Sequence, residues 1–172
     1  MTARRLNAVL LAAGLCATGT GCSDNDDDSA DRRLLELRPV VSSTEGPCAE
    51  AILDRDRNDG EVRLPVAADG RDECLHLARA IVDAKDVRSA TVGETPSKQP
   101  ALSVVLGAAG SADLDGFAER NMGKRLAIVA DGDVVSAPAV RSTSFAGRIQ
   151  VTGLSKEKTD ELFRRLDKLI NR

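Results

Sequence analysis

Residues 121–138 read NMGKRLAIVADGDVVSAP, and this stretch decides the fold. Positions 126–130 are apolar without a break, which is typical of a central strand covered on both faces, or of one whose outer face is only partly exposed. Asp131-Gly132 is a strong signal for a two-residue hairpin turn, because both residues tolerate a positive φ. Residues 134–137 supply the returning strand, and Pro138 ends the pairing because proline has no N–H. The stretch therefore predicts a hairpin at the centre of a small sheet.

Alternating and apolar runs predict further strands on both sides of this hairpin. In the first run, Leu35 and Leu37 are expected to face the core, while Glu36 and Arg38 face outward. Pro39 favours an edge position or a bulge there, because it cannot donate to a ladder. The expected strands are residues 34–41, 62–66 (a short edge strand), 87–92, 101–106 and 147–153.

Two helices are predicted. The first begins at a cap formed by Ser111 or Asp113 and stops at Gly123, and the second begins at the cap Ser155. The segment 74–82 stays open between a helix, which its apolar spacing favours, and a partly extended segment. The apolar face of the first helix contains Leu114, Phe117, Ala118 and Met122, and that of the second contains Leu162, Phe163, Leu166, Leu169 and Ile170. Ion pairs four residues apart are expected between Asp160 and Arg164 and between Glu161 and Arg165.

The net charge and the aromatic content of the chain argue against nucleic-acid binding. The chain has 172 residues and a formal charge of −3, which is not the charge of a basic nucleic-acid binder. Aromatic residues make up only 2%, with no Trp, no Tyr and three Phe, so stacking platforms for bases are scarce. We expect no nucleic-acid partner.

The first 21 residues have the three parts of a secretory signal: Arg4 and Arg5, an apolar run over 6–17, and small residues over 18–21. This end of the signal, with Cys22 directly after it, resembles the lipobox of bacterial lipoproteins, in which the Cys is acylated. The alternative is an ordinary signal peptide followed by a free or disulfide-bonded Cys22. We expect a signal peptide over 1–21 and a lipid-anchored acidic tether over 22–33.

Removal of the signal leaves Cys22, Cys48 and Cys74. If Cys22 carries the lipid, the other two form an even pair in an oxidising compartment, which favours a disulfide. Neither has a nearby Cys-x-x-Cys or His-x-x-x-His partner, so a zinc site lacks ligands. The whole pattern predicts an α+β fold in which a small, mostly antiparallel sheet packs against two main helices, in a single domain with one disulfide.

The candidate catalytic and metal-binding residues lack the partner residues that a catalytic or metal site requires. His76 is the only His and has no second base or ligand nearby in the sequence. Ser136 is the most tempting nucleophile, but no base is identifiable for it. Residues 54–61 look like a calcium loop, yet a loop counted from Asp54 has Asp59 where Gly belongs and Pro65 where the bidentate Glu belongs. We predict no catalytic residue, no metal and no cofactor.

Residues 123–138, the strand 147–153 and the helix start 154–157 resemble SecD, a membrane component of protein export. The similar part is the head subdomain of its first large extracytoplasmic domain. Residues 37–40 and 86–90 also look like SecD segments, so the similarity covers about 34–172. It implies that 74–82 is less helical than its spacing indicates, and it transfers no catalytic residue.

The resemblance implies a binding role, since the SecD head is thought to engage the emerging polypeptide. The chain departs from the family at two places: the aromatic residue usual near the strand 101–106 is absent, and Phe145-Ala146-Gly147 stands where the family has a Gly pair before the Arg148 strand. We also expect that the chain has the head subdomain without the membrane helices. In the family, those helices couple the movement of the head to the proton gradient. The hypothesis is a non-enzymatic, lipid-anchored extracytoplasmic domain at the bacterial cell membrane that contacts exported polypeptides or translocon components. The alternatives are a secreted enzyme and a structural envelope lipoprotein.

Overall fold

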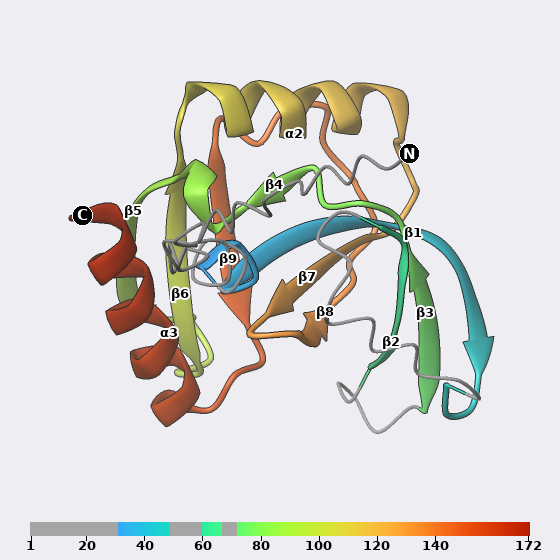
Figure 1. Cartoon of the computed structure of the whole chain (residues 1–172), viewed down its shortest axis with the longest axis horizontal. Coiled ribbons are helices and arrows are strands. Elements are labelled where there is room, and N and C mark those ends of the chain that lie inside the picture. The colour runs from blue at the N-terminus through green and yellow to red at the C-terminus, as the bar shows by residue number, and fades with distance from the viewer. Residues whose placement is uncertain (1–30, 49–59, 67–71) are drawn as a thin grey trace, which may run out of the picture.

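Two sheets and two main helices make up the fold (Figure 1). A computed structural model describes residues 31–48, 60–66 and 72–172. The strands are β1 (Leu35–Glu45), β2 (Val62–Val66), β3 (Glu73–Leu77), β4 (Val82–Asp83), β5 (Val87–Glu94), β6 (Pro100–Leu106), β7 (Leu126–Ala130), β8 (Asp133–Ser136) and β9 (Arg148–Thr152). The helices are α2 (Ala108–Arg120) and α3 (Lys156–Ile170), with a short 3-10 helix η2 (Ala84–Asp86). This mixed content confirms the predicted α+β class.

The larger sheet closes on itself. Its strand order is β3-β2-β8-β7-β1-β4, and β3 also pairs with β1. The first half of β1 pairs with β7 up to Pro39, and the second half pairs with β3 from Val40 onward. A register shift between Val40 and Ser42 marks the bend. The strands β1, β3, β2, β8 and β7 therefore form a ring, in which only the β2–β8 pair is parallel.

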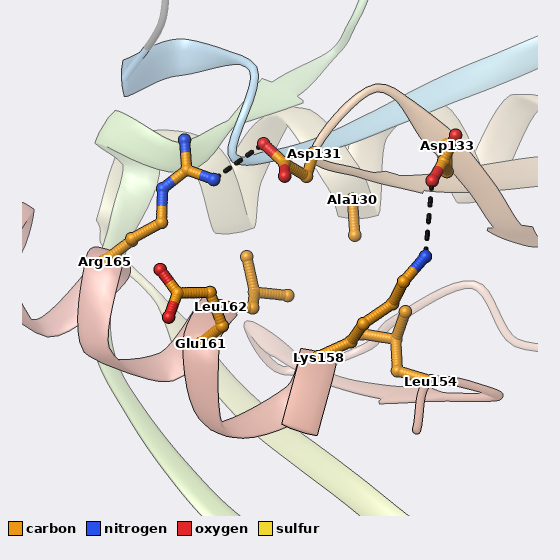
Figure 2. A pocket seen from close by; sticks show the side chains of 8 residues that line it. All are labelled: Ala130, Asp131, Asp133, Leu154, Lys158, Glu161, Leu162 and Arg165. Atoms are coloured by element: carbon orange, nitrogen blue, oxygen red, sulfur yellow. Dashed lines mark hydrogen bonds and ion pairs between the residues drawn. The ribbon is translucent and has the colours of Figure 1, made fainter. Parts of the chain in front are cut away.

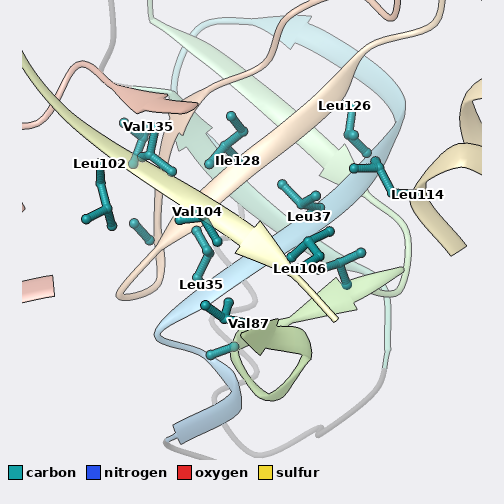
Figure 3. Close-up of a cluster of buried hydrophobic side chains, with 14 of the residues drawn as sticks. Leu35, Leu37, Val87, Leu102, Val104, Leu106, Leu114, Leu126, Ile128 and Val135 are labelled. Carbon is teal, nitrogen blue, oxygen red and sulfur yellow. The ribbon is translucent and has the colours of Figure 1, made fainter. Parts of the chain in front are cut away.

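Two apolar cores lie on opposite faces of β7, and we call them the interlayer core and the ring core. The interlayer core fills the space between the two sheets, and Figure 3 shows its residues from β1, β6, β7 and β8. It takes Leu126, Ile128 and Ala130 from β7. The ring core takes Ala127 and Val129 from β7. All five residues of β7 are buried, so the predicted central strand is covered on both faces.

The hairpin turn after β7 has the predicted geometry. Asp131 has a φ of 52° and Gly132 has a φ of 86°. Two successive positive φ values define the turn whose twist matches that of the flanking strands. Ala130 and Asp133 face each other across it in the β7–β8 ladder. The turn therefore ends β7 and starts β8 without any intervening loop.

The smaller sheet has the order β5-β6-β9, and α3 packs along β5 and β6 (Figure 1). The side chain of Ser155 caps α3 by accepting from the Lys158 N–H, as predicted. Leu162 and Leu166 are buried. The other three residues of the predicted stripe, Phe163, Leu169 and Ile170, are partly buried against the interlayer core.

Helix α2 begins earlier and ends earlier than the sequence predicts. Its first residue is Ala108 and its N-cap is Gly107, so neither Ser111 nor Asp113 caps it. Gly107 has no side chain that could act as a cap, and Ala108 and Ala109 favour the helical conformation at this start. Because α2 ends at Arg120, Met122 falls outside the helical register, and 51% of its surface is exposed.

One strand prediction also needs correction. The strand β2 is no edge strand, because β3 and β8 flank it on its two sides. The segment 74–82, which its spacing left open, is extended with β3 and β4 at its ends, as the family resemblance implied. The apolar residues of this segment are divided between the two cores. Leu75 and Leu77 belong to the ring core, and Val82 belongs to the interlayer core.

The prediction that Glu36 and Arg38 face outward is wrong, because they are only 8% and 6% exposed. In the ladder they lie opposite Val129 and Ala127, which both belong to the ring core. The Arg38 guanidinium donates to both Glu36 carboxylate oxygens at 2.8 and 3.1 Å. It also donates to the carbonyl oxygens of Gly60 and Ala78, at 3.1 Å each. The closed ring thus contains a satisfied ion pair that an open sheet would expose.

Replacing Arg38 by Met should lower the free energy of unfolding by about 3–5 kcal/mol, because it leaves the Glu36 carboxylate buried without its partner. The double variant Glu36→Leu/Arg38→Met should recover much of that loss. Urea unfolding followed by circular dichroism measures both. The exposed Arg63→Met on β2 is the matched control and should change stability by no more than about 0.5 kcal/mol. An Arg38→Met variant as stable as this control would contradict the interpretation.

Candidate functional site

A shallow pocket of about 90 Å³ lies between the β7–β8 turn and α3, and we call it the turn–helix cleft (Figure 2). The turn contributes Asp131 and Asp133, and it is positioned by the two positive φ values described above. The helix contributes Lys158, Glu161 and Arg165, which recur on one face because they are spaced three and four apart. The remaining lining residues are Ala130, Leu154 and Leu162.

Two ion pairs cross the cleft. Arg165 Nη1 lies 2.7 Å from Asp131 Oδ1, and Lys158 Nζ lies 3.6 Å from Asp133 Oδ2. The side chains of both pairs are substantially exposed, so water screens them. Such pairs contribute at most about 1 kcal/mol each to stability. The cleft is therefore bordered by charges of both signs over an apolar floor.

The predicted ion pairs of α3 form differently. Arg165 pairs with Asp131 of the turn and not with Glu161. Glu161 pairs instead with Arg164, three residues later, and Asp160 pairs with Lys156. Sequence spacing identifies neighbours within a helix, but it has no signal for a partner 34 residues away. Sequence spacing therefore did not predict either of the two ion pairs that cross the cleft.

The structure keeps the candidate catalytic residues apart. Ser136 ends β8, while His76 lies on β3, and β2 runs between these two strands. The His76 ring nitrogen Nε2 lies 2.8 Å from Glu61 Oε2, so the imidazole has a local partner across the β2–β3 edge. Lys124 is exposed and lies before β7, at the end remote from the turn. Within ranges 31–48, 60–66 and 72–172, no group of three His, Cys, Asp or Glu residues is placed to hold a metal ion.

Two of the perturbed titratable groups, Asp83 and Arg125, have structural causes. Burial raises the pKa of Asp83, while the Lys85 N–H that its carboxylate accepts acts in the opposite direction. Asp83 and Asp86 form a capping box on η2, which explains a half-buried carboxylate there. The hydrogen bond to the Glu73 carboxylate raises the pKa of Arg125, and that guanidinium also holds the Ala137 carbonyl. Neither group lines the turn–helix cleft.

The predicted disulfide is present. Cys48 and Cys74 are joined with an S–S distance of 2.00 Å and a Cα–Cα distance of 5.0 Å. Cys74 is a buried residue of β3, opposite Thr44 of β1. The bridge therefore fastens the segment after β1 to the ring. Cys22, the acidic run 24–28 and residues 54–59 of the rejected calcium loop lie outside the described residues.

The described helices include none that is both long and apolar enough to cross a membrane. Fold and cleft together define a small α+β domain that presents a ring-shaped sheet, a disulfide and a mixed-charge cleft. The family model described as "SecDF, P1 head subdomain" matches residues 61–167. The chain belongs to this family.

Known proteins of this kind resemble the chain over part of their length. The protein translocase subunit SecD of Aquifex aeolicus is 39% identical over 120 residues, which are 69% of this chain and 23% of that protein. SecD of Treponema pallidum is 32% identical over 81 residues, or 47% of this chain and 14% of that protein. The chain thus spans less than a quarter of these relatives.

A solved structure described as "Structure and function of a membrane component SecDF that enhances protein export" superposes with a TM-score of 0.57 and 25% identity. The match covers 86% of this chain and 70% of that one. These findings confirm the family that residues 123–138 and 147–157 indicated.

Removal of the disulfide should destabilise the domain strongly. The two cysteines are 26 residues apart, and a bridge closing a loop of that size stabilises by about 3–4 kcal/mol in the chain-entropy model. Cys48→Ala/Cys74→Ala should therefore unfold at lower urea concentration than the parent chain. Reduction with dithiothreitol should shift the parent to the same midpoint and leave the double variant unchanged. Equal midpoints for the oxidised parent and the variant would contradict a stabilising role.

Proposed function

We propose that this chain is a non-enzymatic, lipid-anchored extracytoplasmic domain that contacts exported polypeptides or the export machinery. The family match over residues 61–167 carries the proposal. The relatives are named as subunits of a protein translocase, and the similar structure is described as a membrane component that enhances protein export. In those proteins the head domain belongs to a component of protein export, and we propose the same setting for this chain.

The location outside the cytoplasm rests on two independent features. Residues 1–21 have the pattern of a secretory signal, and Cys22 follows it where a lipoprotein would carry its lipid. The Cys48–Cys74 disulfide is a feature of oxidising compartments and is rare in the cytosol. A lipid on Cys22 would hold the domain at the bacterial membrane, and residues 22–33 would serve as its tether.

The turn–helix cleft is the contact surface that the geometry favours. Its floor of Ala130, Leu154 and Leu162 suits an apolar side chain. Its border has carboxylates on the turn and cations on α3, which can pair with either charge on a bound chain. A surface that accepts apolar, acidic and basic groups together fits a partner of varied sequence, such as a polypeptide in transit.

Photo-crosslinking in living cells tests the partner. A photoreactive residue at Glu161 lines the cleft, while one at Lys124 lies beyond the opposite end of β7 and serves as the matched control. We expect crosslinks to newly exported polypeptides or translocon components from position 161 and several-fold fewer from position 124. Absence of both partners at position 161 would refute the proposal. Equal yields at both positions would remove the cleft as the contact surface.

Cell fractionation tests the anchor. Cys22→Ala should release the protein from membranes, because acylation requires the thiol. Cys16→Ala should leave it membrane-bound, since Cys16 lies within the segment that is removed. Mass spectrometry of the N-terminal peptide should find acyl chains on Cys22 in the parent. A Cys22→Ala protein that stays in the membrane fraction would contradict lipid anchoring.

A further inference from the structure

A cationic and apolar surface lies where α2 ends, and we call it the α2-end patch. It consists of the exposed residues Val41, Arg120, Met122, Lys124 and Arg141. Figure 1 shows the end of α2 and the bend of β1 on the same side of the molecule. The described part of the chain has three exposed large apolar residues, and Val41 and Met122 are two of them. Exposed apolar side chains and cations therefore occur together at this end of the domain.

The cations come from two segments that pair through their backbones. The Gly123 N–H donates to the Val140 carbonyl at 2.9 Å, and the Val140 N–H donates to the Lys124 carbonyl at 2.8 Å. Val140 is buried, while Arg141, the next residue, is exposed beside this pair. Arg120 lies in the last turn of α2 and precedes the same segment. Three positive charges thus gather around one short backbone ladder.

The two apolar residues border the same ladder. Met122 comes directly before it and is 51% exposed. The Val40 N–H donates to the Arg125 carbonyl at 3.1 Å, so β1 passes beside the segment that leads into β7. Val41 follows at the register shift of β1, where the β1–β3 ladder skips it, and it is 55% exposed. The bulge thus leaves an apolar side chain at the surface next to the cations.

The positive charges of the patch are not balanced by acids. Of the residues that the structure describes, no carboxylate forms an ion pair with any of the three cations. Arg125 beside them is already paired with Glu73. On α2, Asp115 accepts hydrogen bonds from residues 144–145, one helical turn before the exposed Glu119. Glu119 offsets one charge, and the patch stays positive.

We propose that the α2-end patch docks on an anionic lipid bilayer, with its cations at the headgroups and its two apolar side chains in the interface. Lys and Arg are attracted to anionic membrane surfaces, and exposed apolar side chains beside them add to the binding. The proposal rests on the proposed location at the bacterial membrane. Removal of the signal takes away Arg4 and Arg5 and no acid, so the mature chain has a formal charge of −5. Attraction to an anionic surface therefore requires positive charge that is concentrated in one place.

The tether is long enough for this orientation. The Asp131 N–H donates to the Leu34 carbonyl at 3.2 Å, so the described chain begins at the turn end of β7. Lys124 lies beyond the other end of β7, about 23 Å away at the rise of a strand. The nine residue steps from Cys22 to Asp31 span at most about 32 Å when fully extended. A lipid on Cys22 can therefore lie in the same bilayer that the patch contacts.

Vesicle sedimentation tests the patch in the absence of the lipid. The mature chain, residues 22–172 with Cys22→Ala, should bind vesicles of equal parts phosphatidylglycerol and phosphatidylcholine, and should bind phosphatidylcholine vesicles far less. The triple variant Arg120→Gln/Lys124→Gln/Arg141→Gln should lower the partition coefficient at least about tenfold, because each cation near the surface adds to the attraction. Since this form has no lipid, a failed anchor or a missing polypeptide partner leaves the result unchanged.

The matched control removes three exposed cations elsewhere, on β5, on the β5–β6 turn and on α3, and is Arg88→Gln/Lys98→Gln/Lys168→Gln. It makes the same change in net charge and should keep the partition coefficient within about threefold of the parent, because salt screens distant charges. Met122→Ser should weaken binding several-fold at every salt concentration, since apolar burial is not screened.

A charge-conserving variant separates charge from local structure. Arg120→Lys/Lys124→Arg/Arg141→Lys should bind the vesicles as the parent does. The proposal is overturned if the parent does not bind phosphatidylglycerol vesicles, if both glutamine triples lose binding equally, or if the patch triple retains it. Binding of poly-glutamate without binding of vesicles would also overturn it, because that result indicates an acidic protein partner.

Discussion

The pairing of β1 with two distant strands is the constraint on which the fold depends. One half of β1 bonds to β7 and the other half bonds to β3, so the larger sheet must curl until it closes. A closed sheet has an inside, and that inside holds the ring core. It also desolvates Glu36 and Arg38, which then require each other and the carbonyls of Gly60 and Ala78. The bend in β1, the closed ring and the buried Glu36–Arg38 ion pair therefore depend on one another.

Local signals in the sequence predicted those parts of the fold that short-range physics determines. The hairpin at Asp131-Gly132 needs only two residues that tolerate positive φ, and Ser155 needs only the next helical turn to act as a cap. Alternation correctly placed Leu35 and Leu37 inward. It could not show that Glu36 and Arg38 are also covered, because a period of two separates the faces of a strand without saying what lies on each.

The candidate site was harder to predict because it joins elements that are distant in sequence. The turn was predicted and α3 was predicted, but their contact depends on how the smaller sheet presents α3 to the larger one. Arg165 has Glu161 and Asp131 as possible partners, and only the tertiary arrangement selects Asp131. The Cys48–Cys74 bridge, in contrast, followed from cysteine parity and the expected compartment, neither of which requires knowledge of the fold.

The stretch that identifies the family is mostly interior. Residues 126–130 divide their side chains between two cores, and the turn that follows fits one backbone geometry. Substitutions there act first on stability, so they report poorly on binding. The surfaces that can meet a partner lie at its margins: Asp131 and Asp133 at the cleft, and Met122 and Lys124 at the α2-end patch.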